Sequence, residues 1–156
     1  MRLKRDDQTY FNFSNPSSVK VVREHHEKYD RISAILDANP TLLDPAHRDL
    51  ARHLSSSKRG RSGDYTTEQV IRSLMVMFIE GESYRGVVIR IEDSEFLRNF
   101  ARLGGRPMMD YSFLSKAYGA LSEDTWAAMN AALSEYACET EAITGEKLRM
   151  DSTAYE

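Results

Sequence analysis

The stretch Thr66-Thr-Glu-Gln-Val-Ile-Arg-Ser-Leu-Met-Val-Met-Phe-Ile-Glu-Gly81 decides how this chain folds. Thr66 and Gln69 match a capping box, in which the threonine hydroxyl and the glutamine side chain satisfy each other's backbone N–H groups. The helix that follows, about 67–80, becomes apolar on every side at 74–79, and Gly81 ends it. Because an apolar circumference is typical of a helix buried on all sides, we predict that this is the central core helix.

Further helices are predicted after Gly81, and most of them begin at a residue that can cap them. Ser83 precedes a helix to about 93, Asp110 precedes one over about 111–121, and Ser122 precedes a last helix to about 140. A short helical segment holds Phe96, Leu97 and Phe100. The helices over 83–93 and 111–121 could form a helix-turn-helix-like unit. The predicted fold class is an all-α helical bundle.

We predict that residues 1–64 form a basic helical arm and linker and that residues 65–143 form a helical domain. Its first 18 residues are polar and expected to be loose. A helix over roughly 19–37 ends at Asn39-Pro40, and Asp44 should cap a short second helix. The loop Ser55–Gly63 carries Lys58, Arg59 and Arg61 and predicts a flexible basic hinge.

The last residues, Gly145-Glu-Lys-Leu-Arg-Met-Asp-Ser-Thr-Ala-Tyr-Glu156, change period from helix to alternation. Leu148, Met150, Ser152 and Ala154 fall on one face, which predicts a β-strand within 144–156. A strand needs a partner, and the sequence upstream contains no second convincing strand. We therefore expect this strand to open a sheet whose remainder is missing, so that the chain would be the front half of a larger protein.

Composition limits the classes of protein that remain. The 156 residues are 41% hydrophobic and 29% charged, which is typical of a soluble globular protein. Residues 1–61 hold 12 Lys/Arg against 8 Asp/Glu, whereas residues 62–156 hold 9 against 16. Only the N-terminal third is therefore basic enough to favour a nucleic-acid partner. The single cysteine, Cys138, and the lack of a membrane-length apolar run predict a cytoplasmic protein, with no membrane partner.

Candidate functional residues are few, and several readings stay open at this point. The cations of the loop could contact phosphates or be solvated. The arginines around the short middle helix could contact phosphates or pair with Glu92, Asp93 and Glu95. These arginines are Arg85, Arg90, Arg98, Arg102 and Arg106. A further candidate is Lys116, on the outward face of the helix over 111–121, beside Ser112, Ser115 and Gly119.

The metal-ligand and nucleophile signals are weaker. His25 and His26 are adjacent, so on a helix they point about 100° apart and suit separate contacts better than one ion. Cys138 is expected to be a packing thiol beside the core face of the last helix. Asp151 on the predicted strand could hold a divalent cation, but one carboxylate does not make a site.

Several stretches together resemble a known family. They run from Ile32-Ser-Ala-Ile-Leu-Asp-Ala-Asn-Pro40 through Tyr65-Thr-Thr-Glu-Gln-Val-Ile-Arg72, Glu82-Ser-Tyr-Arg85, Phe96-Leu-Arg-Asn-Phe100 and Leu121-Ser-Glu-Asp-Thr-Trp126 to Leu148-Arg-Met-Asp-Ser-Thr-Ala-Tyr-Glu156. In this order they resemble the N-terminal part of bacterial insertion-sequence transposases of the DDE class, the ISNCY-type relatives of the InsH-like group. The final stretch is the most specific of them.

The resemblance implies a function and a site. Asp151 would be the first of three metal-binding catalytic carboxylates in a ribonuclease-H-like α/β core, where two Mg²⁺ ions support phosphoryl transfer. The other two carboxylates would lie beyond Glu156. The chain alone is therefore expected to be inactive as an enzyme and to bind Mg²⁺ only weakly.

The implied partners are DNA, at terminal inverted repeats, and a second copy of the protein in a homodimeric transposition complex. The implied location is the nucleoid within the cytoplasm. The alternatives are a free-standing helix-turn-helix DNA-binding regulator and a non-functional transposase remnant.

Overall fold

The computed structural model describes residues 2–5, 17–54 and 65–140, and their secondary structure is entirely helical. The all-α prediction is therefore confirmed for this part of the chain, whereas the strand predicted within 144–156 lies outside it. The helices are α1 (Lys20–Ala38), the short 3₁₀ helix η1 (Pro40–Leu43), α2 (Asp44–Leu54), α3 (Thr67–Glu80), α4 (Tyr84–Asp93), α5 (Glu95–Phe100), α6 (Tyr111–Ala120) and α7 (Glu123–Glu139).

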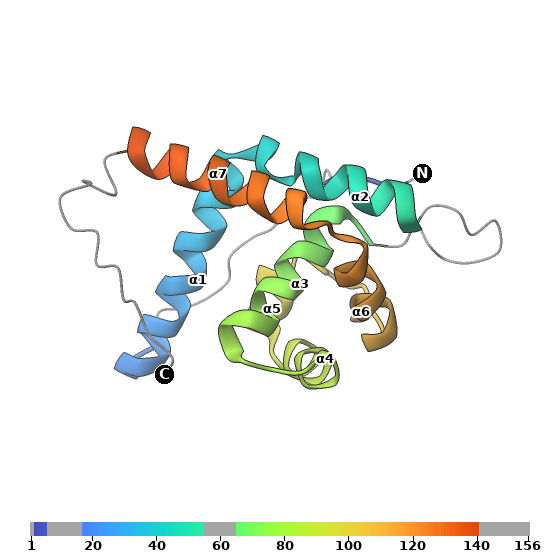
Figure 1. Ribbon diagram of the computed structural model, residues 1–156. Helices are drawn as coiled ribbons and strands as arrows, with labels where there is room; N and C mark the ends of the chain where they lie inside the picture. The colour runs from blue at the N-terminus through green and yellow to red at the C-terminus, as the bar shows by residue number, and fades with distance from the viewer. Residues whose placement is uncertain (1, 6–16, 55–64, 141–156) are drawn as a thin grey trace, which may run out of the picture.

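Helix α3 lies at the centre of the arrangement (Figure 1). Helices α2 and α7 contact each other and cross one end of α3. Helix α1 runs along one side and contacts α5, and α4 and α6 lie on the other. One hydrophobic core joins helices that precede residue 55 to helices that follow residue 64. It includes Leu36 of α1, Leu50 of α2, Leu74 of α3, Ile91 of α4 and Leu114 of α6.

The predicted capping residues explain where the helices begin and end. The Thr66 hydroxyl accepts from the Gln69 backbone N–H, and the Gln69 side chain accepts from the Thr66 N–H, so the capping box is confirmed. Gly81 ends α3 in the left-handed conformation, with φ of +67°. Ser83, Asp110 and Ser122 cap α4, α6 and α7 as predicted.

Two predictions for the N-terminal section were wrong. Asp44 does not cap α2, because η1 runs directly into that helix, and its carboxylate pairs with Lys4 instead. Residues 2–5 are not loose. The carbonyl oxygens of Leu3 and Lys4 accept hydrogen bonds from the Thr67 and Glu68 N–H groups, so this short segment covers the N-terminus of α3.

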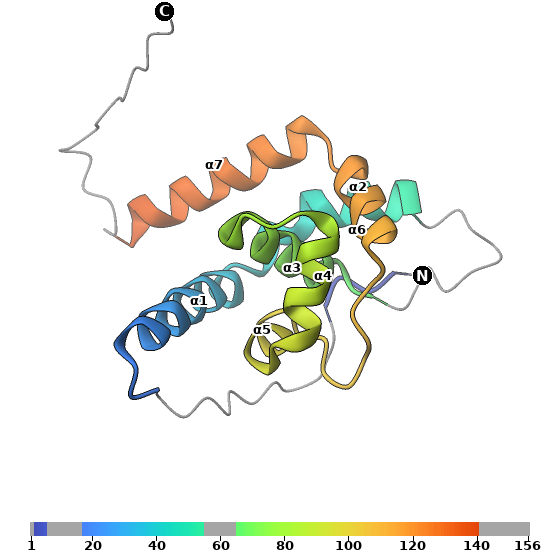
Figure 2. The ribbon, with the colours of Figure 1, turned by 90° about the horizontal axis from the view of Figure 1, so that it is seen from below.

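The prediction that α3 is buried on every side at 74–79 was also wrong in part. Leu74, Val76 and Met77 are buried, but Phe78 is 56% exposed. The reason is that α1 and α7 flank this end of α3 without closing over it (Figure 2). They leave an apolar hollow of about 290 Å³, lined in part by Ile32, Ile35, Met75, Phe78 and Leu133.

Candidate nucleic-acid interface

Helices α4 and α6, which were predicted to form a helix-turn-helix-like unit, contact each other. Arg85 of α4 crosses the gap to α6. Its guanidinium lies 4.7 Å from the centre of the Tyr111 ring and donates a hydrogen bond of 3.3 Å to the Tyr111 hydroxyl. This stacking holds an exposed positive charge at the first turn of α6.

The outward face of α6 has the composition that the sequence predicted. Leu114 and Ala117 are buried, and the polar positions on the other side are exposed, namely Ser112, Ser115, Lys116 and Gly119. Asp110 caps the helix by accepting from the Ser112 side chain and backbone N–H, which lowers the pKa of its carboxyl. The face therefore offers one ammonium, from Lys116, to a phosphate oxygen, whereas the Ser112 hydroxyl donates to Asp110 and the Ser115 hydroxyl is hydrogen-bonded to Tyr84.

Arg90 is only partly available for a ligand. It is 56% exposed and lies 3.6 Å from a carboxylate oxygen of Glu80. It also lines a hollow of about 510 Å³ between α1, α4 and α5, where the carboxylates of Glu82 and Asp93 stand nearby. Because these acids oppose an incoming phosphate, Arg90 is a weaker candidate for DNA contact than Arg85 or Lys116.

Glu80 joins α3 to α1 beside this hollow. One of its carboxylate oxygens accepts from the Tyr29 hydroxyl at 2.6 Å and lies 2.9 Å from His25 Nε2. Burial alone would raise the pKa of Glu80, but the hydrogen bonds from Tyr29 and His25 outweigh it, so the pKa is lowered. Burial and the neighbouring carboxylate raise the pKa of Tyr29, which stays a hydrogen-bond donor.

Arg98 has a role within the fold. It pairs with Glu92 at 2.5 Å and donates to the backbone carbonyls of Gly104 and Arg106. Those contacts close the turn that leaves α5, and the Arg98 side chain is only 20% exposed. Arg106 itself is partly buried in the same turn.

Arg102 is also tied to carboxylates. It bonds Asp37 of α1 at 2.6 Å and Glu68 of α3 at 3.1 Å. Its backbone has φ of +57°, an uncommon conformation for a residue other than glycine. Its carbonyl accepts from the Gln69 side chain at 2.7 Å, so contacts at both ends hold this strained residue in place.

The histidines and the cysteine make no metal site among the residues described. His25 contacts Glu80, and the His26 ring stacks on Phe96 with 3.8 Å between ring centres. No group of three or more His, Cys, Asp or Glu in the described ranges could hold a metal ion. Cys138 is exposed, which corrects the expectation of a packing thiol.

Four of the predicted site residues, Lys58, Arg59, Arg61 and Asp151, lie outside the described residues. The sequence reasoning also missed two cations, Arg48 and Arg52, which are exposed on α2 just before that basic loop. Their spacing of four residues, opposite the buried Ala46 and Leu50, was the signal that could have identified them.

Comparison of the chain with protein-family models, with curated proteins and with solved structures gives no match. Within the described part, no helix combines the length and apolarity needed to cross a membrane. The functional assignment therefore depends on the site residues and on the sequence resemblance.

Proposed function

We propose that this chain is the DNA-binding N-terminal portion of a DDE transposase, which recognises the terminal inverted repeats of an insertion sequence. The sequence resemblance that ends in Asp151-Ser-Thr-Ala-Tyr-Glu156 supports the class of protein. The observation that carries DNA binding is the exposed face of α6, where Lys116, Ser112 and Ser115 project from a helix flanked by Arg85.

The charge pattern explains which residues should bind. Arg98 and Arg102 are occupied by Glu92, Asp37 and Glu68. The binding surface on the helix pair should therefore rest on Arg85 and Lys116, with a smaller contribution from Arg90. Lysine and arginine side chains bind phosphate oxygens by charge-assisted hydrogen bonds.

Catalysis is a separate matter from DNA binding. By the resemblance, Asp151 would supply one carboxylate to a pair of Mg²⁺ ions, and the chemistry that those ions would support is phosphoryl transfer. Two such ions need further carboxylates, and no other residue of the 156 is matched to that role. We therefore expect residues 1–156 alone neither to cleave DNA nor to bind Mg²⁺ tightly.

A salt titration of DNA binding tests this proposal. The affinity of the full chain for duplexes carrying the inverted repeats should fall steeply as salt rises, because each phosphate contact releases counterions. Lys116→Ala should reduce the slope of log K against log salt by about 1. Arg31→Ala removes an exposed charge from α1 and is the matched control, which should leave the slope unchanged. A flat salt response of the unmodified chain would refute DNA binding.

A free-standing regulator is the rival, because the described helices share one hydrophobic core of their own. The regulator should bind one promoter site more tightly than any inverted repeat. The nucleotide sequence after codon 156 separates the two functions. An open frame that supplies another Asp and a Glu, flanked by inverted repeats, supports the transposase, and a gene without them supports the regulator or a remnant.

A further inference from the structure

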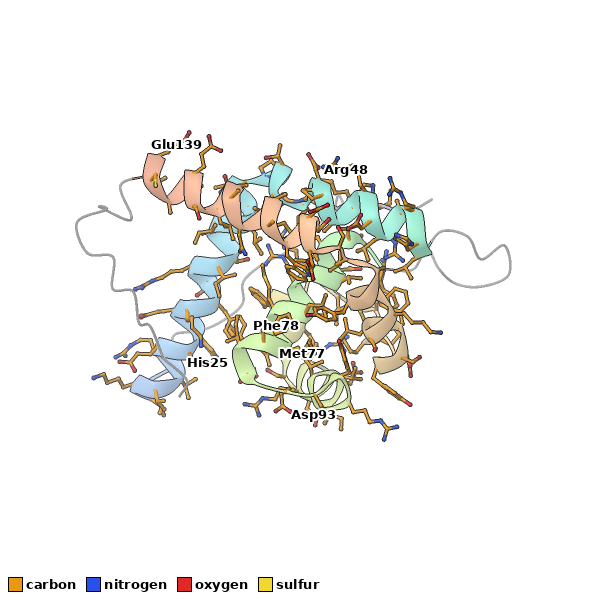
Figure 3. The ribbon with its side chains drawn as sticks, in the orientation of Figure 1. His25, Arg48, Met77, Phe78, Asp93 and Glu139 are labelled. Carbon is orange, nitrogen blue, oxygen red and sulfur yellow. The ribbon has the colours of Figure 1, made fainter. Side chains whose placement is uncertain are left out.

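Helix α2 presents two arginines to solvent from one side. Arg48 and Arg52 are four residues apart, so they lie on the same face with a rise of about 6 Å between them. Both are exposed, while Ala46 and Leu50 on the opposite face are buried in the core. Arg48 lies at the α2 edge of the molecule, at the opposite end from Asp93 of α4 (Figure 3).

The acids of α2 do not neutralise these arginines, because other groups engage them. The Asp44 carboxylate pairs with Lys4. The Asp49 carboxylate accepts from the Ser122 N–H and hydroxyl, both at 2.9 Å, and from the Thr125 hydroxyl at 2.6 Å. These hydrogen bonds lower the pKa of Asp49. Asp49 therefore serves to bind the N-terminus of α7.

The arginines of α2 differ from three other arginines in having no ion pair within the described part of the chain. Arg72, Arg98 and Arg102 each form an ion pair with at least one carboxylate. Within the described ranges, no carboxylate lies at ion-pair distance from Arg48 or Arg52. Two uncompensated guanidinium groups on one rigid helix face are suited to an anionic partner.

The sequence extends this positive charge. Between positions 48 and 61 the chain has five Lys/Arg and one acid, Asp49. The three later cations are Lys58, Arg59 and Arg61, the basic-loop residues already predicted to bind DNA. The first two cations of this stretch thus have a fixed position on a helix that is anchored in the core.

We propose that the exposed face of α2, carried by Arg48 and Arg52, binds the phosphate backbone of duplex DNA as a second surface, separate from the α4–α6 face. This inference rests on the proposed DNA-binding function. Arginine forms bidentate hydrogen bonds with phosphate, and such contacts position a protein on DNA without reading its sequence. The α2 surface should therefore contribute equally to specific and non-specific duplexes.

The test uses the full chain and two short duplexes, one with the inverted repeat and one of arbitrary sequence. Arg48→Ala/Arg52→Ala should lower the slope of log K against log salt by about 2 on both duplexes. Arg23→Ala/Arg31→Ala, which removes two exposed charges from α1, should leave the slope unchanged. Arg48→Lys/Arg52→Lys should keep most of the slope, because the charges remain.

Each outcome decides the inference. If the alanine pair at positions 48 and 52 has the same slope as the α1 control pair while Lys116→Ala still weakens binding, the α2 surface is refuted and the proposed function stands. If the unmodified chain binds neither duplex, both fail. Because all four arginines are exposed, thermal unfolding followed by circular dichroism should be the same for every variant, and a loss of folding in the alanine pair alone would give the arginines a structural role instead.

Discussion

The more polar half of α3 is fully buried, whereas the more apolar half is partly exposed. In the first half, Thr67–Leu74, every residue is buried, including four polar ones that follow Thr67, namely Glu68, Gln69, Arg72 and Ser73. The second half, Met75–Glu80, is almost wholly apolar, yet Phe78 is 56% exposed and Met75 and Ile79 are partly exposed. The degree of burial along α3 therefore does not follow the polarity of its sequence.

The difference arises from what each half meets. Around the first half, the N-terminal segment, α1 and the turn after α5 supply partners for every charge. The Arg72 guanidinium bonds Glu68 at 3.0 Å, Ser33 at 2.8 Å and Asp37 at 3.1 Å. The second half lies between α1 and α7 (Figure 2), where it faces the apolar hollow that residues of both helices line. Polar residues can thus be buried once they are paired, and apolar residues stay exposed when no helix covers them.

The largest effect should come from removing Arg72, which is fully buried and forms hydrogen bonds with residues of α1, α5 and its own helix α3. Arg72→Met removes the buried guanidinium that pairs with Glu68 and Asp37 and leaves Arg102 as the main cation beside both carboxylates, and we expect a loss of about 3–5 kcal/mol in the free energy of unfolding. Urea unfolding measures it, with Arg31→Met on the surface of α1 as the control. A loss below about 1 kcal/mol would mean that the buried charges of the first half are not coupled.

The second-largest effect should come from the apolar contacts in the first half of α3. Leu74 is 1% exposed, and Leu74→Ala should cost about 2–5 kcal/mol, because it removes buried methyl groups and leaves a cavity. The same urea titration measures it beside Phe78→Ala. If the two substitutions cost the same, the contrast between the halves would be lost.

A smaller effect concerns Glu80, the last residue of α3. Its pKa is lowered below the ordinary 4.5, so its contribution is present above pH 4.5 and is lost as the pH falls through the lowered value. Glu80→Gln should cost about 1–2 kcal/mol at neutral pH, by loss of the charged acceptor for Tyr29 and His25. Thermal unfolding from pH 3 to pH 7 checks this, since the variant should approach the unmodified chain at the acidic end. A constant difference across the range would contradict it.

The smallest effect should come from Phe78. Its ring contacts Tyr118 and Trp126, with centres 5.8 and 6.4 Å away, but more than half of the side chain faces solvent. Phe78→Ser should therefore change the free energy of unfolding by no more than about 1 kcal/mol. It should also reduce the fluorescence of a dye that binds apolar surface. A loss as large as that of Leu74→Ala would show that this side of α3 is covered in solution.

Local rules predicted the helices well because their causes lie within a few residues. Thr66 and Gln69 cap each other, and Gly81 supplies the left-handed end of α3, so neither needs the rest of the fold. The prediction for Asp44 was wrong because a 3₁₀ helix precedes it and a distant lysine pairs with its carboxylate. That lysine is 40 residues away in sequence, beyond the reach of any local pattern.

The sequence predicted the residue types of the candidate site but not which of those side chains are free to bind a ligand. Arg98, Arg102 and Arg85 look alike in the sequence, yet the first two are bound to carboxylates and the third is held exposed on Tyr111. The sequence analysis assigned no role to Arg48 and Arg52, and two acids, Asp44 and Asp49, lie close to them in the sequence. Only the fold shows that both acids are engaged elsewhere.

The sequence by itself determined the all-α character of the described chain, the ends of its helices and the supply of cations. These follow from backbone capping and hydrophobic periodicity, which act over one or two turns. The tertiary structure alone decided which charges are buried in pairs, which remain free for a phosphate, and which side of α3 stays open. Those outcomes depend on contacts between residues distant in sequence, because a charge is satisfied, and an apolar face covered, only by what the fold brings against it.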